Sequence, residues 1–175
     1  KQEIIHEEIT EFRNHIAVDE KDQSKKEKYE DDIFAVSNHG FSAHEKLGVA
    51  TTYPITCEEQ ISITQEVSSL FLPIVGRTDF TFQTDGSPFP SRIVELKTSW
   101  SKLGKLKKDG TRSFIVSTAP SAPSYSHLQQ CAFYAARYDF TVPVSLVYVT
   151  AKGCNVFDES NCLDLTKEYL SLIHI

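Results

Sequence analysis

The sequence predicts an α/β fold, because its candidate elements follow one another as helix, three strands, helix and strand. The three strand candidates are runs rich in β-branched and aromatic residues over 61–69, 73–83 and 92–98. An Asp-Gly pair at 85 and 86, typical of tight turns, joins the last two of these strands. With 175 residues, of which 40% are hydrophobic, the chain is large enough to form a single domain with its own core.

The first third of the chain carries two helical patterns separated by a charged segment. Apolar residues three to five positions apart over 4–16 predict an amphipathic helix. The almost wholly charged segment 19–32 is expected to be an exposed connector or the polar end of a helix. A second helix is predicted over 38–47, with Gly40 and His44 on one face. The small Gly40 would let this helix lie close to the sheet.

The second half is predicted to contain a long loop, a helix, a strand and a closing helix. The loop over 99–123 is rich in Lys, Ser, Pro and Gly, and loops of this length in compact domains are usually functional or disordered. A helix is predicted over 124–137, a strand over 142–150 and the closing helix over 163–172. The single predicted domain thus comprises a helical part at 1–50, a core at 60–150 and a C-terminal helix at 158–175.

The net charge of −6 argues against a protein that binds nucleic acid through overall electrostatic attraction alone. A metal-dependent enzyme is not subject to this objection, because bound cations neutralise phosphate at the site. Positive charge is nevertheless concentrated in the predicted loop, which carries five cations against the single acid Asp109. This stretch is either a solvated surface loop or a guide for a phosphate backbone. Its cations are Lys102, Lys105, Lys107, Lys108 and Arg112.

The cysteines show no paired spacing, so we expect neither a zinc site nor a structural disulfide, which fits a reducing intracellular compartment. They are Cys57, Cys131, Cys154 and Cys162. No apolar run is long enough to span a membrane, and the acidic start differs from a signal or transit peptide, so no membrane partner is expected. Because methionine is lacking even at position 1, we expect that Lys1 is not the natural start and that a preceding segment was removed.

Two carboxylates are predicted to meet where two strands pair. Asp79 follows a strand-like run, and Glu95 lies within the next strand candidate. An Asp and a Glu at adjacent strands, together with water and phosphate oxygens, are the ligands that Mg²⁺ or Mn²⁺ prefers. Lys97 lies two residues after Glu95 and so shares its strand face, whereas Leu96 is expected to face the core. The Lys97 ammonium would therefore lie next to a metal-bound water.

Four motifs in a fixed order extend this pattern. They are Gly40-Phe41-Ser42-Ala43-His44, Gly76-Arg77-Thr78-Asp79, Glu95-Leu96-Lys97-Thr98-Ser99 and Gln130-Cys131-Ala132-Phe133-Tyr134. Together they resemble the PD-(D/E)XK nuclease superfamily, in the RecB-like branch that adds Gly-x-x-x-His and Gln-x-x-x-Tyr. Within it they are most like the mitochondrial genome maintenance exonucleases and their phage relatives. The resemblance covers residues 40–150, and Thr78 stands where the family's name has proline.

The resemblance implies a restriction-endonuclease-like α/β core with a mixed central sheet flanked by helices. It implies a magnesium- or manganese-dependent deoxyribonuclease, specifically an exonuclease that acts on single-stranded DNA ends in replication, repair or recombination. The expected compartment is the cytoplasm of a bacterium or phage-infected host, or the mitochondrial matrix. Iron-sulfur relatives need three cysteines close together near the C-terminus, and only Cys154 and Cys162 are available there, so no cluster is expected.

The resemblance also assigns roles at the metal site. Asp79 and Glu95 would bind one or two ions, with the Leu96 carbonyl and His44 completing the protein ligands. For His44, an ordinary partly buried histidine is the alternative. Lys97 would orient the attacking water and stabilise charge on the phosphate; a role as general base would require a strongly depressed pKa. Glu66 is either a ligand of a second metal or an exposed strand residue.

The remaining roles concern the substrate. Gln130 and Tyr134 are one helical turn apart, so both can reach the same substrate or the Lys97 side chain. Gln130 is expected to bond the metal-bound water or the scissile region, and Tyr134 to contact phosphate. Thr98 and Ser99 would bind phosphate. Trp100, Phe41 and Tyr125 are either stacking platforms for bases or core residues. Two other functions stay open: a structure-specific or restriction-type endonuclease with the same site, and a non-catalytic nucleic-acid-binding domain.

Overall fold

The computed structural model describes residues 10, 20–47, 55–57, 60–63, 74–84 and 86–173. Its helices are α2 (Glu20–Lys46), α3 (Tyr125–Ala136), the 3-10 turn η1 (Leu163–Leu165) and α4 (Lys167–Leu170). Its strands are β1 (Ile55–Cys57), β2 (Gln60–Ile63), β3 (Ile74–Arg77), β4 (Phe80–Gln83), β5 (Pro90–Ser99), β6 (Lys102–Leu103), β7 (Phe114–Ile115), β8 (Val144–Thr150) and β9 (Gly153–Phe157). The predicted helix over 4–16 lies outside the described residues, apart from position 10.

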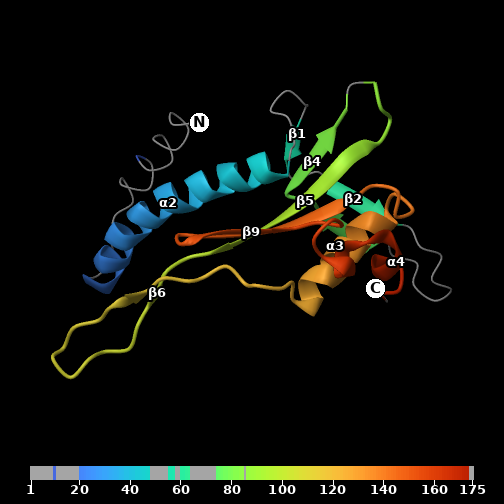
Figure 1. The fold of residues 1–175 in the computed structure, drawn as a ribbon. Helices are drawn as coiled ribbons and strands as arrows, with labels where there is room; N and C mark the ends of the chain where they lie inside the picture. Colours follow the sequence, from blue (N-terminus) through green and yellow to red (C-terminus); the bar gives the residue numbers. More distant parts are fainter. Residues whose placement is uncertain are drawn as a thin grey trace. The chain divides into compact units, whose positions relative to one another are not determined.

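Five strands form a mixed central sheet in the order β1-β4-β5-β8-β9, so the predicted α/β class with a mixed sheet is confirmed (Figure 1). All seven residues of β8 are buried, which explains its uninterrupted apolar sequence. Strand β9 was not predicted. Its five residues are only half-buried, and the segment lacks the strict alternation that would mark it as a strand.

The β4–β5 hairpin is the part of the sheet that positions the acids. The two strands are antiparallel, with Phe80 opposite Val94 and Thr81 opposite Ile93. In the connecting turn, the Ser87 amide donates to the Thr84 carbonyl at 3.0 Å. Gly86 has a φ of +77°, a conformation that glycine adopts without steric cost. The predicted turn and the predicted strand over 92–98 are thus confirmed, although β5 is longer at both ends.

The strand predicted over 73–83 is wrong as a single element. Its first part, β3, pairs with β2 in a separate two-stranded sheet, and its second part, β4, pairs with β1 and β5. Thr78 and Asp79 form the break between the two. The hydroxyl of the buried Thr78 lies 3.0 Å from that of Thr81, a bond that satisfies both side chains at the break. Of the strand predicted over 61–69, residues 64–69 lie outside the described part.

The chain divides into two compact units, each made of three segments. The first comprises residues 1–44, 98–120 and 148–155, and the second comprises 45–97, 121–147 and 156–175. The single domain stays a prediction. No helix in the described ranges is long and apolar enough to cross a bilayer.

In the first unit, α2 continues through the charged segment, so the polar end of a helix was the correct alternative for 19–32. One acid of this segment is not solvated, however. Asp32 is fully buried, accepts a hydrogen bond from the Ser101 amide at 2.9 Å and is paired with Lys28 at 2.5 Å. The prediction that Gly40 allows close packing is wrong, because an added Cβ at that position would meet nothing within 4 Å.

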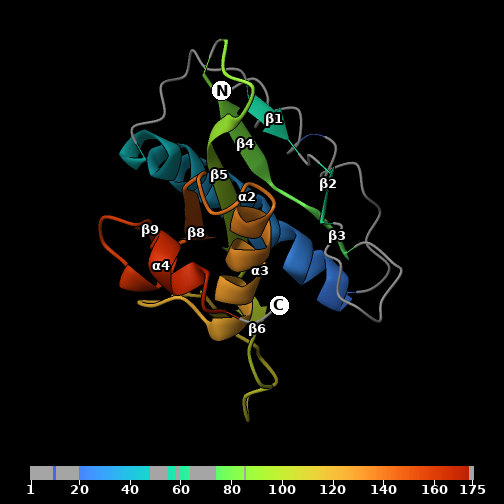
Figure 2. The same ribbon diagram turned by 90° about the vertical axis from the view of Figure 1, so that its right-hand side faces the viewer.

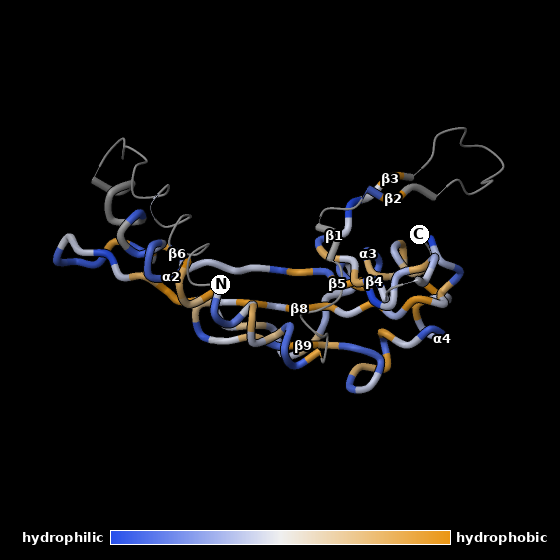
Figure 3. Tube along the Cα trace, turned by 90° about the horizontal axis from the view of Figure 1, so that it is seen from above, coloured by the Kyte–Doolittle hydropathy of each residue, from blue (hydrophilic) through white to orange (hydrophobic). Residues whose placement is uncertain are grey.

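The predicted loop over 99–123 contains a β-hairpin instead, also in the first unit. Strands β6 and β7 are antiparallel, with Lys102 opposite Ile115 and Leu103 opposite Phe114. Gly104 allows the two sides of the hairpin to approach closely. Its amide donates to the Ser113 carbonyl at 2.8 Å, and an added Cβ would lie 2.6 Å from that oxygen. Short strands joined by a polar turn leave little sequence signal. Figure 3 shows the hydrophilic tip of this hairpin beyond β6.

In the second unit, α3 confirms the helix predicted over 124–137. The strand β8, whose residues are divided between the two units, confirms the strand predicted over 142–150. The closing helix over 163–172 is shorter than predicted, since it consists of the η1 turn followed by four residues of α4. Thr166 interrupts it with an extended conformation and caps α4, because its side chain accepts a bond from the Tyr169 amide.

Candidate active site

The β4–β5 hairpin brings Asp79 beside the middle of β5. Since Phe80 is opposite Val94 in an antiparallel pair, Asp79 lies just beyond the paired residues, beside Glu95 and Leu96. The Leu96 amide donates a hydrogen bond to Asp79 Oδ2 at 2.6 Å, which fixes the carboxylate against the strand. Asp79 Oδ1 accepts no hydrogen bond from the residues that the structure describes. This oxygen is therefore available to a ligand.

Glu95 is a buried carboxylate with one unsatisfied oxygen. Its residue is only 2% exposed, its Oε1 is paired with the Lys97 ammonium, and its Oε2 is buried without a hydrogen-bond partner. Burial raises the pKa of Glu95, the bond from Lys97 opposes this shift, and the negative charge of Asp79 adds to it. A buried acceptor without a donor costs about 1–3 kcal/mol, so this oxygen calls for a cation or a proton.

A chain of hydrogen bonds holds Lys97 in place. The Lys97 ammonium donates to Gln130 Oε1 at 2.8 Å, and Gln130 Nε2 donates to the Tyr134 hydroxyl at 2.6 Å. That hydroxyl in turn donates to the carbonyl of Arg77 at 2.5 Å. The Tyr134 hydroxyl is thus bonded to the backbone of β3, and it also lies close enough to Glu95 to influence the pKa of that carboxyl. Arg77 is two residues before Asp79. This series of hydrogen bonds therefore connects Lys97, through two residues of α3, to the segment that carries Asp79.

The helix α3 approaches β3 at Gly76, which brings Gln130 and Tyr134 within reach; Figure 2 shows α3 and β3 in the same view. A Cβ at Gly76 would lie 2.5 Å from Cε1 of Phe133 and 3.4 Å from Cε1 of Tyr134. Only glycine at this position lets the helix approach so closely. Tyr134 is 1% exposed, and burial raises the pKa of its hydroxyl, with Gln130 opposing the shift.

The prediction placed Leu96 toward the core and Glu95 on the opposite face of the strand. The burial of the two residues contradicts it. Glu95 is among the most deeply buried side chains of the described residues, whereas Leu96 is only half-buried. The physical reason is that α3 covers the face of β5 that carries Glu95 and Lys97, as the bond from Lys97 to Gln130 shows. The acids therefore lie in a less hydrated environment than an exposed strand face would give.

The donor set fits a hard divalent cation. Two carboxylate oxygens, Glu95 Oε2 and Asp79 Oδ1, lack protein partners among the described residues. The negative charge of Asp79 raises the pKa of Glu95, so a cation between them would be favourable. The Leu96 carbonyl lies on the same strand. No group of three or more His, Cys, Asp and Glu side chains suited to a metal occurs in the part of the chain that the structure describes. Two carboxylates completed by oxygens are the set that Mg²⁺ favours.

The other predicted metal ligands are not part of this group of bonds. His44 lies near the end of α2 and is half-buried in the first unit, so its bond to a metal stays a prediction. Glu66 lies outside the described residues.

The predicted substrate residues are almost all on the surface. Thr98 is exposed at the end of β5 and Ser99 is half-buried. The five cations of the β6–β7 hairpin are exposed. Trp100 is 38% exposed, and its ring centroid is 6.2 Å from that of Tyr29 on α2. Tyr125 is exposed at the start of α3, whereas Phe41 is half-buried in α2.

Sequence reasoning missed three contributors to the site. The Arg77 backbone carbonyl, which ends the hydrogen-bond chain, carries no side-chain signal. Gly76 was considered only as part of a motif, although its lack of a side chain lets Phe133 of α3 pack against β3. His127 lies one turn before Gln130 on α3, and burial together with the charge of Lys97 lowers its pKa. Its spacing of three residues from Gln130 was a usable signal.

Comparison with known proteins finds similarity only among solved structures. No protein-family model matches the chain, and no curated protein matches it. The crystal structure of SSO0001 is similar over 97% of this chain and 80% of its own, with a TM-score of 0.44 and 16% sequence identity. Similarity at this level assigns neither a family nor a function.

Proposed function

We propose that the chain is a metal-dependent nuclease that hydrolyses phosphodiester bonds of DNA, with a core of the PD-(D/E)XK type. The observation that carries this proposal is the unsatisfied, buried Oε2 of Glu95 beside Asp79, on the strand that also holds Lys97. A purely structural carboxylate at this depth would be expected to have both oxygens hydrogen-bonded. The resemblance of the four motifs supplies the reaction class.

Asp79 and Glu95 would hold one or two Mg²⁺ or Mn²⁺ ions, with the Leu96 carbonyl as a further ligand. When bound, such an ion polarises a phosphoryl oxygen and lowers the pKa of a water molecule, which then serves as nucleophile at neutral pH. The burial of Glu95 favours this binding, because the ion replaces the proton that burial otherwise favours on its carboxylate.

Lys97 would place its ammonium where negative charge develops on the attacked phosphate. In the described structure this ammonium is shared between Glu95 and Gln130, so its position is fixed before substrate arrives. Such preorganisation means that little reorganisation is needed in the transition state. Gln130 and Tyr134 would then act mainly by orienting Lys97, and a direct contact of Tyr134 with phosphate is disfavoured because its hydroxyl proton is donated to Arg77.

The substrate proposed from the resemblance is single-stranded DNA, degraded from its ends in an intracellular compartment. The exposed cations of the β6–β7 hairpin support an anionic partner of extended shape. An end-labelled and a circular DNA, each single- and double-stranded, incubated with Mg²⁺, Mn²⁺ or EDTA, test this directly. Cleavage of the linear single strand alone is expected. Nicking of the circles would indicate an endonuclease, and no cleavage in either metal would refute catalysis.

Two matched pairs of variants test the residue roles. Glu95→Gln is expected to abolish cleavage and weaken Mn²⁺ binding in calorimetry, while Glu168→Gln, on the exposed face of α4, leaves both unchanged. Lys97→Ala is expected to lower the cleavage rate on the order of 10²-fold or more and to keep metal binding, with Lys152→Ala as its control. Normal turnover by Glu95→Gln in Mg²⁺ would remove the metal assignment, and a loss under about threefold in Lys97→Ala would make Lys97 structural.

A further inference from the structure

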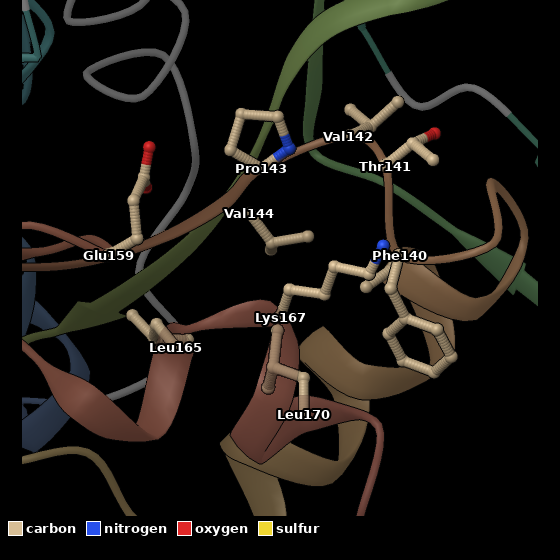
Figure 4. Close-up of a pocket in the computed structure, with 10 residues that line it drawn as sticks. Phe140, Thr141, Val142, Pro143, Val144, Glu159, Leu165, Lys167 and Leu170 are labelled. Carbon is tan, nitrogen blue, oxygen red and sulfur yellow. The ribbon is translucent and has the colours of Figure 1, made fainter.

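The second unit contains a pocket whose wall includes none of the residues of the candidate active site. It is a cavity of about 500 Å³ between the end of α3, the start of β8 and the η1–α4 segment (Figure 4). Apolar side chains form most of its wall: Ala135, Phe140, Val142, Val144, Leu165 and Leu170. Both the volume and the apolar lining are typical of pockets that bind small molecules.

One uncompensated positive charge belongs to this pocket. The Lys167 side chain makes no hydrogen bond and no ion pair with the described residues, and Figure 4 shows it extending across the pocket toward Phe140. The other charged residue of the wall, Glu159, is neutralised by Arg92. Arg92 Nη2 lies 2.9 Å from Glu159 Oε1, and Nη1 lies 3.2 Å from Oε2. The pocket therefore offers an ammonium beside an apolar interior.

The backbone at the pocket edge is strained. Asp139 and Phe140 have φ values of +50° and +55°, in the left-handed region that bulky residues rarely adopt. This conformation reverses the chain at the end of α3, where the Phe140 amide donates to the Ala135 carbonyl at 2.9 Å. Glycine is the usual residue at such a reversal. A phenylalanine held here at a cost of about 1–3 kcal/mol is the kind of strain found at ligand sites.

We propose that this pocket binds a small amphipathic monoanion, such as a medium-chain carboxylate. Its apolar body would lie against Val142, Leu165 and Leu170, and its anionic group would pair with the Lys167 ammonium. A neutral ligand would leave the ammonium without a partner, and a polyanion would find one cation only. Lys167 is an exposed residue of the pocket wall, so the charge pair is favourable only where the bound ligand excludes water from it.

Calorimetric titration with decanoate and with decanol tests the proposal on the intact chain. Saturable binding of decanoate is expected, and decanol should bind more weakly because it carries no charge. Lys167→Glu should weaken decanoate binding at least about tenfold, which corresponds to about 1.4 kcal/mol. It should leave decanol nearly unchanged. Lys152→Glu is the matched control, since it makes the same charge change at an exposed lysine of the first unit and should have no effect.

A second variant keeps the test decisive if Lys167→Glu folds poorly. Thr141 is an exposed residue of the pocket wall, so Thr141→Trp adds a ring at the opening with little effect on the core. It should weaken both ligands, while far-UV circular dichroism and the unfolding midpoint stay unchanged. Absence of saturable decanoate binding to the natural chain would overturn the proposal. Equal decanoate affinity in Lys167→Glu or in Thr141→Trp would also overturn it. None of these measurements depends on nuclease activity.

Discussion

The same substitution, glycine to alanine, should have opposite effects at two positions. At Gly76, an added Cβ would lie 2.5 Å from Cε1 and 3.2 Å from Cδ1 of Phe133, whereas carbon atoms in favourable contact are about 3.5–4.0 Å apart. Phe133 is only 7% exposed, so its ring cannot move away without opening a void or shifting α3. Overpacking of this kind costs about 1–3 kcal/mol, and Gly76→Ala should destabilise the chain by that amount.

At Gly40, no atom lies within 4 Å of an added Cβ, and the residue is in the interior of α2. Alanine is favoured over glycine in a helix by about 0.5–1 kcal/mol, so Gly40→Ala should stabilise. Urea unfolding followed by circular dichroism and by fluorescence of Trp100, the single tryptophan, measures both changes. In thermal unfolding, each kcal/mol should shift the midpoint by about 2–4 °C.

The refuting results differ for the two positions. Gly76→Ala with unchanged stability would show that α3 does not lie against β3 as described. A further check is the double variant Gly76→Ala with Phe133→Leu, in which the offending ring atom is gone. Its loss should be smaller than the sum of the two single losses by at least about 0.5 kcal/mol, because the residues are in contact. Additive losses would assign the effect of Gly76→Ala to another contact.

Three further predictions follow from the described contacts. Replacing Lys105, Lys107 and Lys108 by Ser should flatten the slope of log affinity for single-stranded DNA against log salt by about 2, and an unchanged slope would make the β6–β7 hairpin an ordinary solvated surface. Burial, with a smaller contribution from the charge of Glu95, raises the pKa of the Cys131 thiol to about 12. At pH 8 a disulfide reagent should therefore react with the same number of thiols in the folded Cys131→Ala variant as in the natural chain. One reactive thiol fewer in the variant would refute the burial of Cys131. Burial tends to raise the pKa of Asp32, but bonds from Lys28 and Ser101 outweigh it and lower the pKa below 3.8. The difference in the free energy of unfolding between the natural chain and Asp32→Asn should therefore be complete near pH 6 and shrink as the pH falls below 3.8. If urea unfolding gave a difference that does not change with pH, the charged state of Asp32 would be refuted.

The parts of the fold that the sequence predicted are those with a strong local pattern. The apolar run of β8, the alternation in β5 and the helical spacing of α3 each depend on neighbouring residues, so their elements were found within a few positions. The break at Thr78 and Asp79 was missed, because it depends on which partner each strand pairs with. Pairing of β6 with β7 was missed for the same reason.

The candidate site shows the same division between local and distant causes. Asp79, Glu95 and Lys97 could be named because strand spacing places them on one face, and Gln130 with Tyr134 because helical spacing does. The burial of Glu95 could not be predicted from residue spacing, because it comes from α3, a helix that follows Glu95 by thirty positions or more in the sequence. Nor could spacing give the unsatisfied oxygen Oε2 of Glu95, which depends on how the side chains of α3 are arranged around the strand.

These distant causes converge on one glycine. Without a side chain at Gly76, α3 approaches β3; because it does, the Tyr134 hydroxyl reaches the Arg77 carbonyl and Gln130 reaches Lys97. The lysine is then held against Glu95 Oε1, and Oε2 is left for another partner. A change at Gly76 should thus weaken metal binding and cleavage together, although this residue carries no chemical group. A variant of Lys97 should separate the two, since in the proposed mechanism the ammonium stabilises charge on phosphate and is not a ligand of the ion.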